Sequence, residues 1–330
     1  MSERVDRAVH AVRGGGDRVR TAVARRGFPW RAPTAPRGVE VPPKRKHTGA
    51  DFDTEWARKP AARAARSFIV AGPLKGMVKA VADPEIVGVD RLADLRDVAE
   101  DTDGPPPPVI FAANHASHVD APLMLTSIPR PWRSRLVVGA GADYFFTTRL
   151  TGTVSALALG AIPIDRTRVN RRSADLLSSL IDEGWSLLIF PEGGRSPDGW
   201  GQPFRGGAAF LSIRCGVPVV PVHLDGTGAI LGRGAKWPKP GRSKVTFGAP
   251  LLPTGDDDAR RFGERIERAV AELGDEAISD WWSARQRAAA GTTPSLTGPG
   301  YHGWRRAWAL TEQRARGKAG QRRRQQRTWP

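Results

Sequence analysis

Between residues 109 and 247, short apolar runs alternate with segments long enough to form helices, and this alternation limits the fold more than any other feature. The runs lie at 109–113, 136–139, 162–164, 185–190, 218–224 and 244–247. Apolar residues at helical spacing fill 173–183, 208–215 and 260–273. Strands separated by helices predict an α/β protein, which we expect to be a single mixed sheet flanked by helices.

The residues before 109 add a predicted helix at 54–82 and a strand at 84–89. Gly72-Pro73 is expected to break or kink the helix, because proline removes a backbone donor. Residues 101–108 contain four consecutive prolines and are predicted to form a loop.

The net charge of +17 lies at the two ends of the chain. Residues 1–50 hold 12 Lys and Arg against 4 acids, and 283–330 hold 11 against 1, whereas 51–282 hold 28 against 29. We therefore expect a basic, largely disordered arm at 1–53, a nearly neutral domain at 54–282 and a basic, Trp/Arg-rich tail at 283–330. Such ends can bind anionic lipid or nucleic acid, or can be solvated tails.

Cysteine usage and hydropathy suggest a compartment. The single cysteine, Cys215, cannot form an internal disulfide and is expected to be plain packing. No apolar run approaches the ~18 residues that span a membrane, and the start lacks the apolar region of a secretory signal. The chain is therefore expected to be cytoplasmic.

The first candidate for chemistry follows the strand at 109–113, in the stretch VIFAANHASHVD. On a continuous helix, five residues at about 100° each would place His115 and Asp120 roughly 140° apart. They can meet only if His115 lies in the loop and Asp120 at the helix entry, where a carboxylate could orient the imidazole as a base. The alternative is that Asp120 only caps the helix and His115 is an ordinary loop histidine.

Two further candidates also follow strands, where α/β sheets place their sites. FPEGGRSPDG at 190–199 combines adjacent glycines with Arg195, a set that suits an anion because backbone N–H groups can approach it. GAIPIDR places Arg166 directly after the strand at 162–164. The alternative is an ordinary turn in the first case and a solvated basic helix in the second.

Other chemistries lack their motifs. The sequence has no G-x-S-x-G nucleophile elbow and no P-loop or dinucleotide fingerprint. The remaining histidines are scattered, so no metal site is expected, although His118 could serve as a second candidate base.

Four stretches together resemble the conserved blocks of the glycerolipid acyltransferases, the lysophosphatidic acid acyltransferase family. NHASHVD resembles the NH-x4-D block, GAIPIDR the second block, FPEGGRS the FPEGTRS block, and VPVVPVHL the proline-containing fourth. They occur in the family's order and cover roughly residues 84–250. The chain departs from the pattern at Gly194, where the family usually has threonine, and thereby lacks one hydroxyl donor to the acceptor's phosphate.

The resemblance implies a role for each matching residue. His115 would deprotonate the acceptor hydroxyl and Asp120 would orient it. The acceptor and its phosphate would be held by Arg166, Glu192, Gly193, Gly194 and Arg195. Pro221 would belong to the acyl-donor side. No metal or cofactor is implied beyond acyl-CoA or acyl-carrier protein as co-substrate.

The implied reaction transfers a fatty acyl group to a lysophospholipid, with 1-acyl-glycerol 3-phosphate giving phosphatidic acid as the leading expectation. The alternatives are another lysolipid or glycolipid acceptor, or a non-enzymatic basic protein that binds membrane or nucleic acid. We expect the basic ends, with Trp281, Trp282 and the indoles beyond 300, to hold the chain on an anionic membrane at the inner face of the cell membrane. No nucleic-acid partner is expected for the enzyme.

Overall fold

The computed structural model describes residues 49–101, 105–164, 171–196 and 199–298, all of which belong to one compact unit. The seven strands are β1 (Pro84–Val87), β2 (Ile110–Ala113), β3 (Leu136–Gly141), β4 (Ala161–Ile164), β5 (Ser186–Ile189), β6 (Val219–Asp225) and β7 (Ser243–Phe247). The helices are α2 (Pro60–Ile69), α3 (Lys75–Ala82), α4 (Ala93–Asp101), α5 (Asp120–Ser127), α6 (Arg130–Arg133), α7 (Ala142–Phe145), α8 (Arg149–Leu159), α9 (Arg171–Asp182), α10 (Gly207–Cys215), α11 (Thr227–Leu231), α12 (Ala259–Ile278) and α13 (Trp281–Ala289). Short 3-10 turns at Gly49–Asp51, Glu55–Arg58 and Val89–Leu92 complete the set.

The strands form one mixed sheet in the order β1-β7-β6-β2-β5-β3-β4. The five strands from β6 to β4 are parallel, whereas β7 pairs antiparallel with β6 and parallel with β1. The carboxyl ends of β2, β5, β3 and β4 therefore meet at one edge, where α/β sheets place their sites. The predicted fold class is confirmed.

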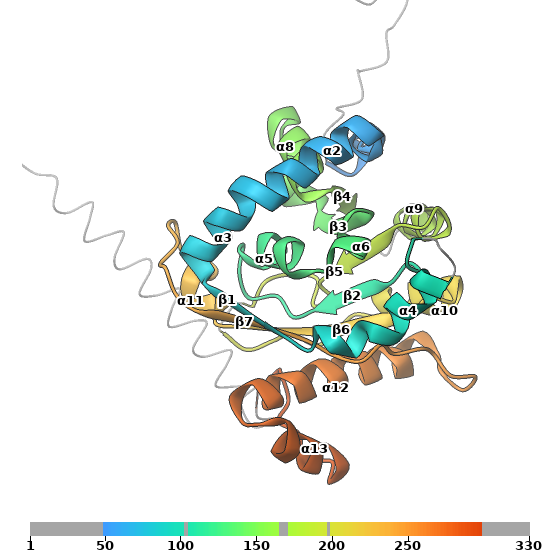
Figure 1. Cartoon of the computed structure of the whole chain (residues 1–330), viewed down its shortest axis with the longest axis vertical. Coiled ribbons are helices and arrows are strands. Elements are labelled where there is room, and N and C mark those ends of the chain that lie inside the picture. The colour runs from blue at the N-terminus through green and yellow to red at the C-terminus, as the bar shows by residue number, and fades with distance from the viewer. Residues whose placement is uncertain (1–48, 102–104, 165–170, 197–198, 299–330) are drawn as a thin grey trace, which may run out of the picture. The chain divides into compact units, whose positions relative to one another are not determined.

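Helices cover both faces of the sheet (Figure 1). One face carries α3 and α5, and its core includes Met124 of α5 and Phe111 of β2. The other carries α9, α10 and α12, with Phe262 of α12 and Ile110 of β2 in the core. Neighbouring β2 residues thus point to opposite faces and both are buried, as expected for a central strand covered on two sides.

The predicted helix at 54–82 is divided in two but is not broken. Between α2 and α3 the backbone makes a π-helical turn over Val70–Leu74 that contains Pro73. A wider turn accommodates proline without ending the helix, so the axis continues (Figure 1). The predicted loop at 101–108 is shifted by one residue, because α4 extends to Asp101 and β2 begins at Ile110.

The folded domain continues past the expected boundary at 282, which falls inside α13. Asp280 caps this helix by accepting from the Ser283 N–H. Arg287 then forms a bidentate pair with Asp275 of α12, with N–O distances of 2.6 and 2.8 Å. The chain runs on to Leu296, whose carbonyl accepts from the Gly201 N–H. Residues 283–298 are therefore part of the domain and not of a poorly ordered tail.

Candidate active site

Asn114 is the first residue after β2, and its side chain fixes the backbone where the loop of the candidate site begins. Its Oδ1 accepts from the Leu224 N–H at 2.7 Å and its Nδ2 donates to the Leu224 carbonyl at 2.9 Å. The side chain thereby continues the β2–β6 ladder by one residue. The backbone position of His115, the next residue, is therefore fixed relative to the carboxyl end of β2.

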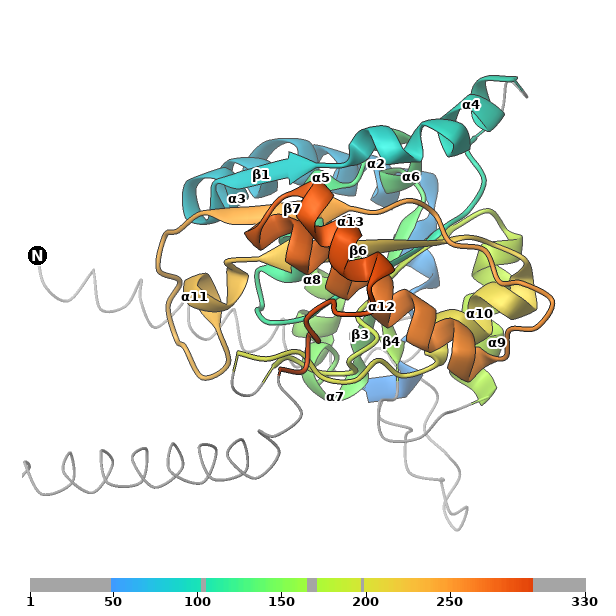
Figure 2. The ribbon, with the colours of Figure 1, turned by 90° about the horizontal axis from the view of Figure 1, so that it is seen from below.

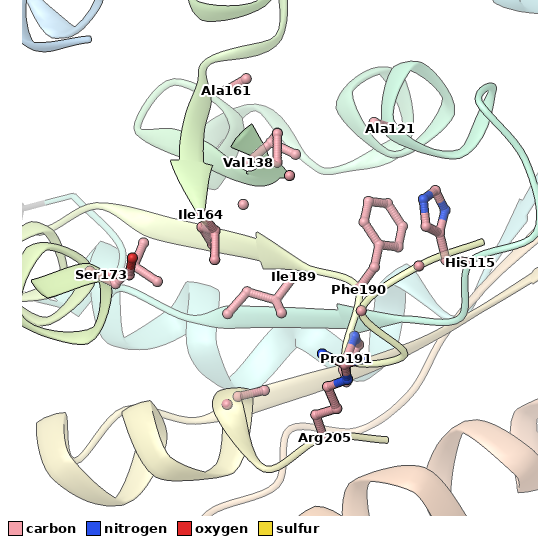
Figure 3. A pocket seen from close by; sticks show the side chains of 18 of the residues that line it. His115, Ala121, Val138, Ala161, Ile164, Ser173, Ile189, Phe190, Pro191 and Arg205 are labelled. Carbon is pink, nitrogen blue, oxygen red and sulfur yellow. The ribbon is translucent and has the colours of Figure 1, made fainter. Parts of the chain in front are cut away.

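His115 and Asp120 meet, as the sequence predicts. The distance from His115 Nδ1 to Asp120 Oδ2 is 2.8 Å, and the Asp120 side chain is fully buried. With its Nδ1–H donated to the carboxylate, the imidazole keeps Nε2 as the nitrogen that can accept a proton. The ring stacks on Phe190 with a centroid distance of 4.3 Å, which sets its plane (Figure 3).

The alternative that Asp120 only caps the helix is wrong. Asp120 is the first residue of α5, whose N-cap is Val119. Its Oδ2 accepts from the backbone N–H groups of Ala116 and Ser117, both at 2.8 Å, in addition to the imidazole. The carboxylate therefore closes the loop that carries His115 and does not serve the helix that follows.

Glu192 supports the same loop from the other side. Its Oε1 accepts from the His115 N–H at 2.8 Å, and its Oε2 accepts from the Gln202 N–H at 2.9 Å. The side chain is 2% exposed and is not among the residues that line the pocket. Burial raises the pKa of its carboxyl group to about 7, against the opposing effect of the two backbone hydrogen bonds. Its observed contacts are thus to the protein backbone, whereas the resemblance implied a contact with the acceptor.

The two glycines after Glu192 differ in their surroundings. Gly193 has a φ of +71°, at which a residue with a side chain is strained, and a Cβ there would lie 2.8 Å from Arg205 Nε, so the arginine side chain would have to shift. Gly194 has an ordinary φ, and a Cβ there would come no closer than 4.0 Å to a neighbour, Gln202 Nε2. The structure therefore has room for the threonine that the family usually carries at 194.

Arg195 faces the pocket beside two aromatic side chains. Its guanidinium lies 5.9 Å from the centre of the Tyr144 ring. The Tyr144 hydroxyl is 3.0 Å from His118 Nε2, and the two rings stack. Burial, followed by the charges of Arg195 and His115, lowers the pKa of His118. His118 thus belongs to a Tyr144 pair, and its Nε2 is engaged by the tyrosine hydroxyl.

These groups open onto a pocket of about 1380 Å³. One part is polar and contains His115, His118, Arg195 and Arg205. From there apolar residues line the ends of β5, β3 and β4 and parts of α9 and α10 (Figure 3). They include Val138, Ala161, Ile164, Leu177, Ile189 and Leu211. The same two helices also contribute Arg171, Asp175 and Arg214, of which the last two form an ion pair. A base at one polar end of a largely apolar pocket suits a substrate with a polar head and a hydrocarbon chain.

The structure does not bring all the predicted site residues together. Arg166 lies outside the described residues. Pro221 is buried within β6, where its carbonyl accepts from the Gly248 N–H at 2.9 Å, and it does not line the pocket. Its observed place is in the sheet, beneath the loop that carries His115.

Several pocket residues were missed by sequence reasoning. Tyr144 lines the pocket and is 51% exposed, whereas Phe146, two residues on, is fully buried. Arg205, Arg171 and Arg214 also line it, although they lie outside the motifs. Arg171 is the first residue of α9, Arg205 lies two residues before α10 and Arg214 lies in the last turn of α10, so these arginines share no pattern that the sequence could have shown. No group of three or more acidic, histidine or cysteine residues in the described part of the chain is placed to hold a metal ion.

The fold and the site are similar to those of α/β acyltransferases. Residues 96–225 match the family model described as Acyltransferase. The chain is 33% identical over 132 residues to the chloroplastic 1-acyl-sn-glycerol-3-phosphate acyltransferase BAT2 of Brassica napus, covering 39% of this chain and 36% of that protein. It is 26% identical over 189 residues to the mouse 1-acyl-sn-glycerol-3-phosphate acyltransferase alpha, covering 53% of this chain and 62% of that protein. The matched segment is thus similar to the glycerolipid acyltransferases, as the four blocks had predicted, and it spans less than two thirds of either relative.

A solved structure shares the fold. The 1-acyl-sn-glycerophosphate acyltransferase PlsC of Thermotoga maritima superposes with a TM-score of 0.51 at 22% sequence identity, covering 70% of this chain and 85% of that one. Among the described residues, none of the helices has the length and hydrophobicity needed to cross a bilayer.

Proposed function

We propose that the protein transfers a fatty acyl group from acyl-CoA or acyl-carrier protein to the free hydroxyl of 1-acyl-glycerol 3-phosphate, giving phosphatidic acid. The observation that carries this proposal is the His115–Asp120 pair at the polar end of a pocket with an apolar interior. Arg195 at the same end supplies a donor for the phosphate. The names of the curated relatives support this choice of acceptor.

In the proposed reaction, His115 Nε2 takes the proton of the acceptor hydroxyl while its oxygen attacks the thioester carbonyl. The tetrahedral intermediate then collapses, the C–S bond breaks, and the thiolate takes the proton back from the imidazolium. Asp120 stabilises the imidazolium through Oδ2, at 2.8 Å from Nδ1. This sequence of steps needs no metal or cofactor and forms no covalent acyl-enzyme.

The acceptor is lipid, so we extend the proposal to a peripheral position on the inner face of an anionic cell membrane. The absence of a spanning helix from the described residues is compatible with this position. Other lysolipid or glycolipid acceptors fit the same pocket chemistry. Arg195 and the other pocket arginines favour an acceptor that carries a phosphate.

The test is thiol release from acyl-CoA by the purified full chain against a panel of lysolipid acceptors. His115→Ala should abolish acceptor-dependent release, and His118→Ala is the matched control because it removes a second histidine from the same pocket. We expect the control to retain most of the kcat. Absence of acceptor-dependent release in wild type would refute the enzyme and favour a basic binding protein with a degenerate site, whereas equal activity in wild type and His115→Ala would refute the role of His115 as the base.

A further inference from the structure

The loop between α11 and β7, residues 232–242, has a composition unlike that of the rest of the surface. Its sequence, GRGAKWPKPGR, contains four cations and no acid. Trp237 at its centre is 82% exposed, which makes it the most exposed aromatic side chain of the described residues. None of the four cations forms an ion pair with another residue in the part of the chain that the structure describes. An exposed indole between unpaired lysines suits the boundary between anionic headgroups and acyl chains.

Contacts at both ends of the loop hold it in place. At its start, the Ser117 hydroxyl donates to the Leu231 carbonyl at 2.8 Å. Further on, the Lys239 N–H donates to the Ile230 carbonyl at 2.8 Å, and the Gly241 N–H donates to the Val81 carbonyl of α3 at 3.0 Å. Figures 1 and 2 both place α11 on the same side of the domain as α3. Trp237 therefore lies at the tip of a loop that is tied down on either side.

The loop begins beside the candidate active site. Ser117 belongs to the loop that Asp120 closes, and its backbone forms a bridge with Gly232. Arg233, the next residue, lines the same pocket as His115. A lipid surface in contact with Trp237 would thus lie next to a pocket entrance that carries a cation.

The other pair of exposed tryptophans lies in a different electrostatic setting. Trp282 of α13 is 63% exposed. Its helix is capped by Asp280 and packs on α12. The nearby cations Arg285, Arg287 and Arg91 are already in ion pairs with Glu272, Asp275 and Glu276 of α12. Cations that are paired with carboxylates attract an anionic surface less than the unpaired cations beside Trp237 do. Trp282 is therefore a matched control with an equally large, exposed side chain.

We propose that the loop at 232–242 is a membrane-docking element that inserts Trp237 into an anionic lipid surface and presents the lysolipid acceptor to the pocket past Arg233. This inference rests on the proposed function for its lipid acceptor, but the docking itself does not depend on catalysis.

The location can be tested on the full chain without any variant. Hydrogen–deuterium exchange is compared with and without vesicles made of equal parts phosphatidylcholine and phosphatidylglycerol. We expect the amides of 233–241 to gain protection, and vesicles of phosphatidylcholine alone to give much less. Protection confined to α13 or to the basic ends would overturn the proposal.

The function of the loop is tested by variants of residues that touch neither His115 nor its partners. Trp237→Ala should raise the KM for acceptor in those vesicles on the order of tenfold, because an inserted indole buries a large apolar area. Lys236→Gln with Lys239→Gln should weaken vesicle binding roughly 30-fold at low salt, since each cation near the surface contributes about 1 kcal/mol. Trp282→Ala should match wild type in both measurements.

A short-chain, monomeric acceptor separates this inference from the proposed function. On that substrate Trp237→Ala should keep the wild-type kcat and KM, because no membrane is involved. Absence of activity with every acceptor would refute the proposed function and leave the exchange result intact. If Trp237→Ala has the wild-type KM for an acceptor in vesicles, the docking role of the loop is refuted, while the proposed enzymatic function is unaffected.

Discussion

Replacing Asp120 separates the electrostatic role of its carboxylate from its structural role. All three donors, the imidazole and two backbone N–H groups, converge on Oδ2 at 2.8 Å, while Oδ1 is buried without a partner. In Asp120→Asn the amide oxygen can occupy the Oδ2 position and accept all three hydrogen bonds. In Asp120→Ala the part-buried Ala116 N–H and the buried Ser117 N–H lose their acceptor, at about 1–3 kcal/mol each.

The catalytic loss in Asp120→Asn follows from the missing charge. Contact between Nδ1 and Oδ2 puts the charges of an imidazolium and a carboxylate about 4 Å apart, which gives about 4 kcal/mol at an effective dielectric constant of about 20. At 1.36 kcal/mol per decade, we expect kcat to fall about 10³-fold. The free energy of unfolding should change by less than about 1 kcal/mol, whereas Asp120→Ala should lose roughly 2–6 kcal/mol.

The assay pairs thiol-release kinetics with urea unfolding of both variants. A kcat of Asp120→Asn within tenfold of wild type would refute the claim that the carboxylate stabilises a charged imidazole. Equal destabilisation of the two variants would refute the hydrogen-bond geometry at Oδ2.

Three further predictions concern neighbouring residues. Gly194→Thr should leave the free energy of unfolding within about 0.5 kcal/mol, whereas Gly193→Ala should cost about 1–3 kcal/mol because of its φ of +71°; chemical denaturation of the pair checks both. Glu192→Gln should lower kcat without raising the KM for the acceptor, because the contacts of Glu192 are to backbone N–H groups. A raised KM at constant kcat in steady-state kinetics would instead indicate that Glu192 contacts the acceptor directly. Burial lowers the pKa of His223 from 6.5 to about 4. The unfolded chain therefore binds more protons between these values, and roughly 3 kcal/mol of stability should be lost as the pH falls through that window. The raised pKa of Glu192 acts in the opposite sense, because stability is lost as the pH rises towards 7. The measurement is the free energy of unfolding of wild type and of His223→Gln as a function of pH. The difference between the two curves gives the contribution of the histidine alone.

The periodicity of the sequence was sufficient to predict most of the fold. Each strand between 109 and 247, and the helices α9, α10 and α12, lie within about five residues of their expected ranges, because each has a continuous apolar run or stripe. Helix α8 was not predicted. Helix α13 was missed because its two tryptophans resembled a membrane tail, although Asp280 before them was an available N-cap signal.

At the site, spacing predicted which residues meet but not what each atom contacts. The five-residue step from His115 to Asp120 required a loop followed by a helix entry, and the structure has both. The acceptor role implied for Glu192 depended on exposure, which is decided by how the 191–196 turn packs beneath the 114–119 loop. Packing of that kind involves residues about 77 positions apart in the chain, and no local pattern encodes it.

The carboxylates of Asp120 and Glu192 bind the loop through the main-chain N–H groups of residues 115, 116 and 117. Every amino acid except proline has such a group. The interval between histidine and aspartate is thus constrained in length, while the identity of a residue such as Ala116 is left open. A library randomised at 116 should therefore yield many active members with only proline excluded, whereas a single insertion or deletion between 115 and 120 should inactivate the protein.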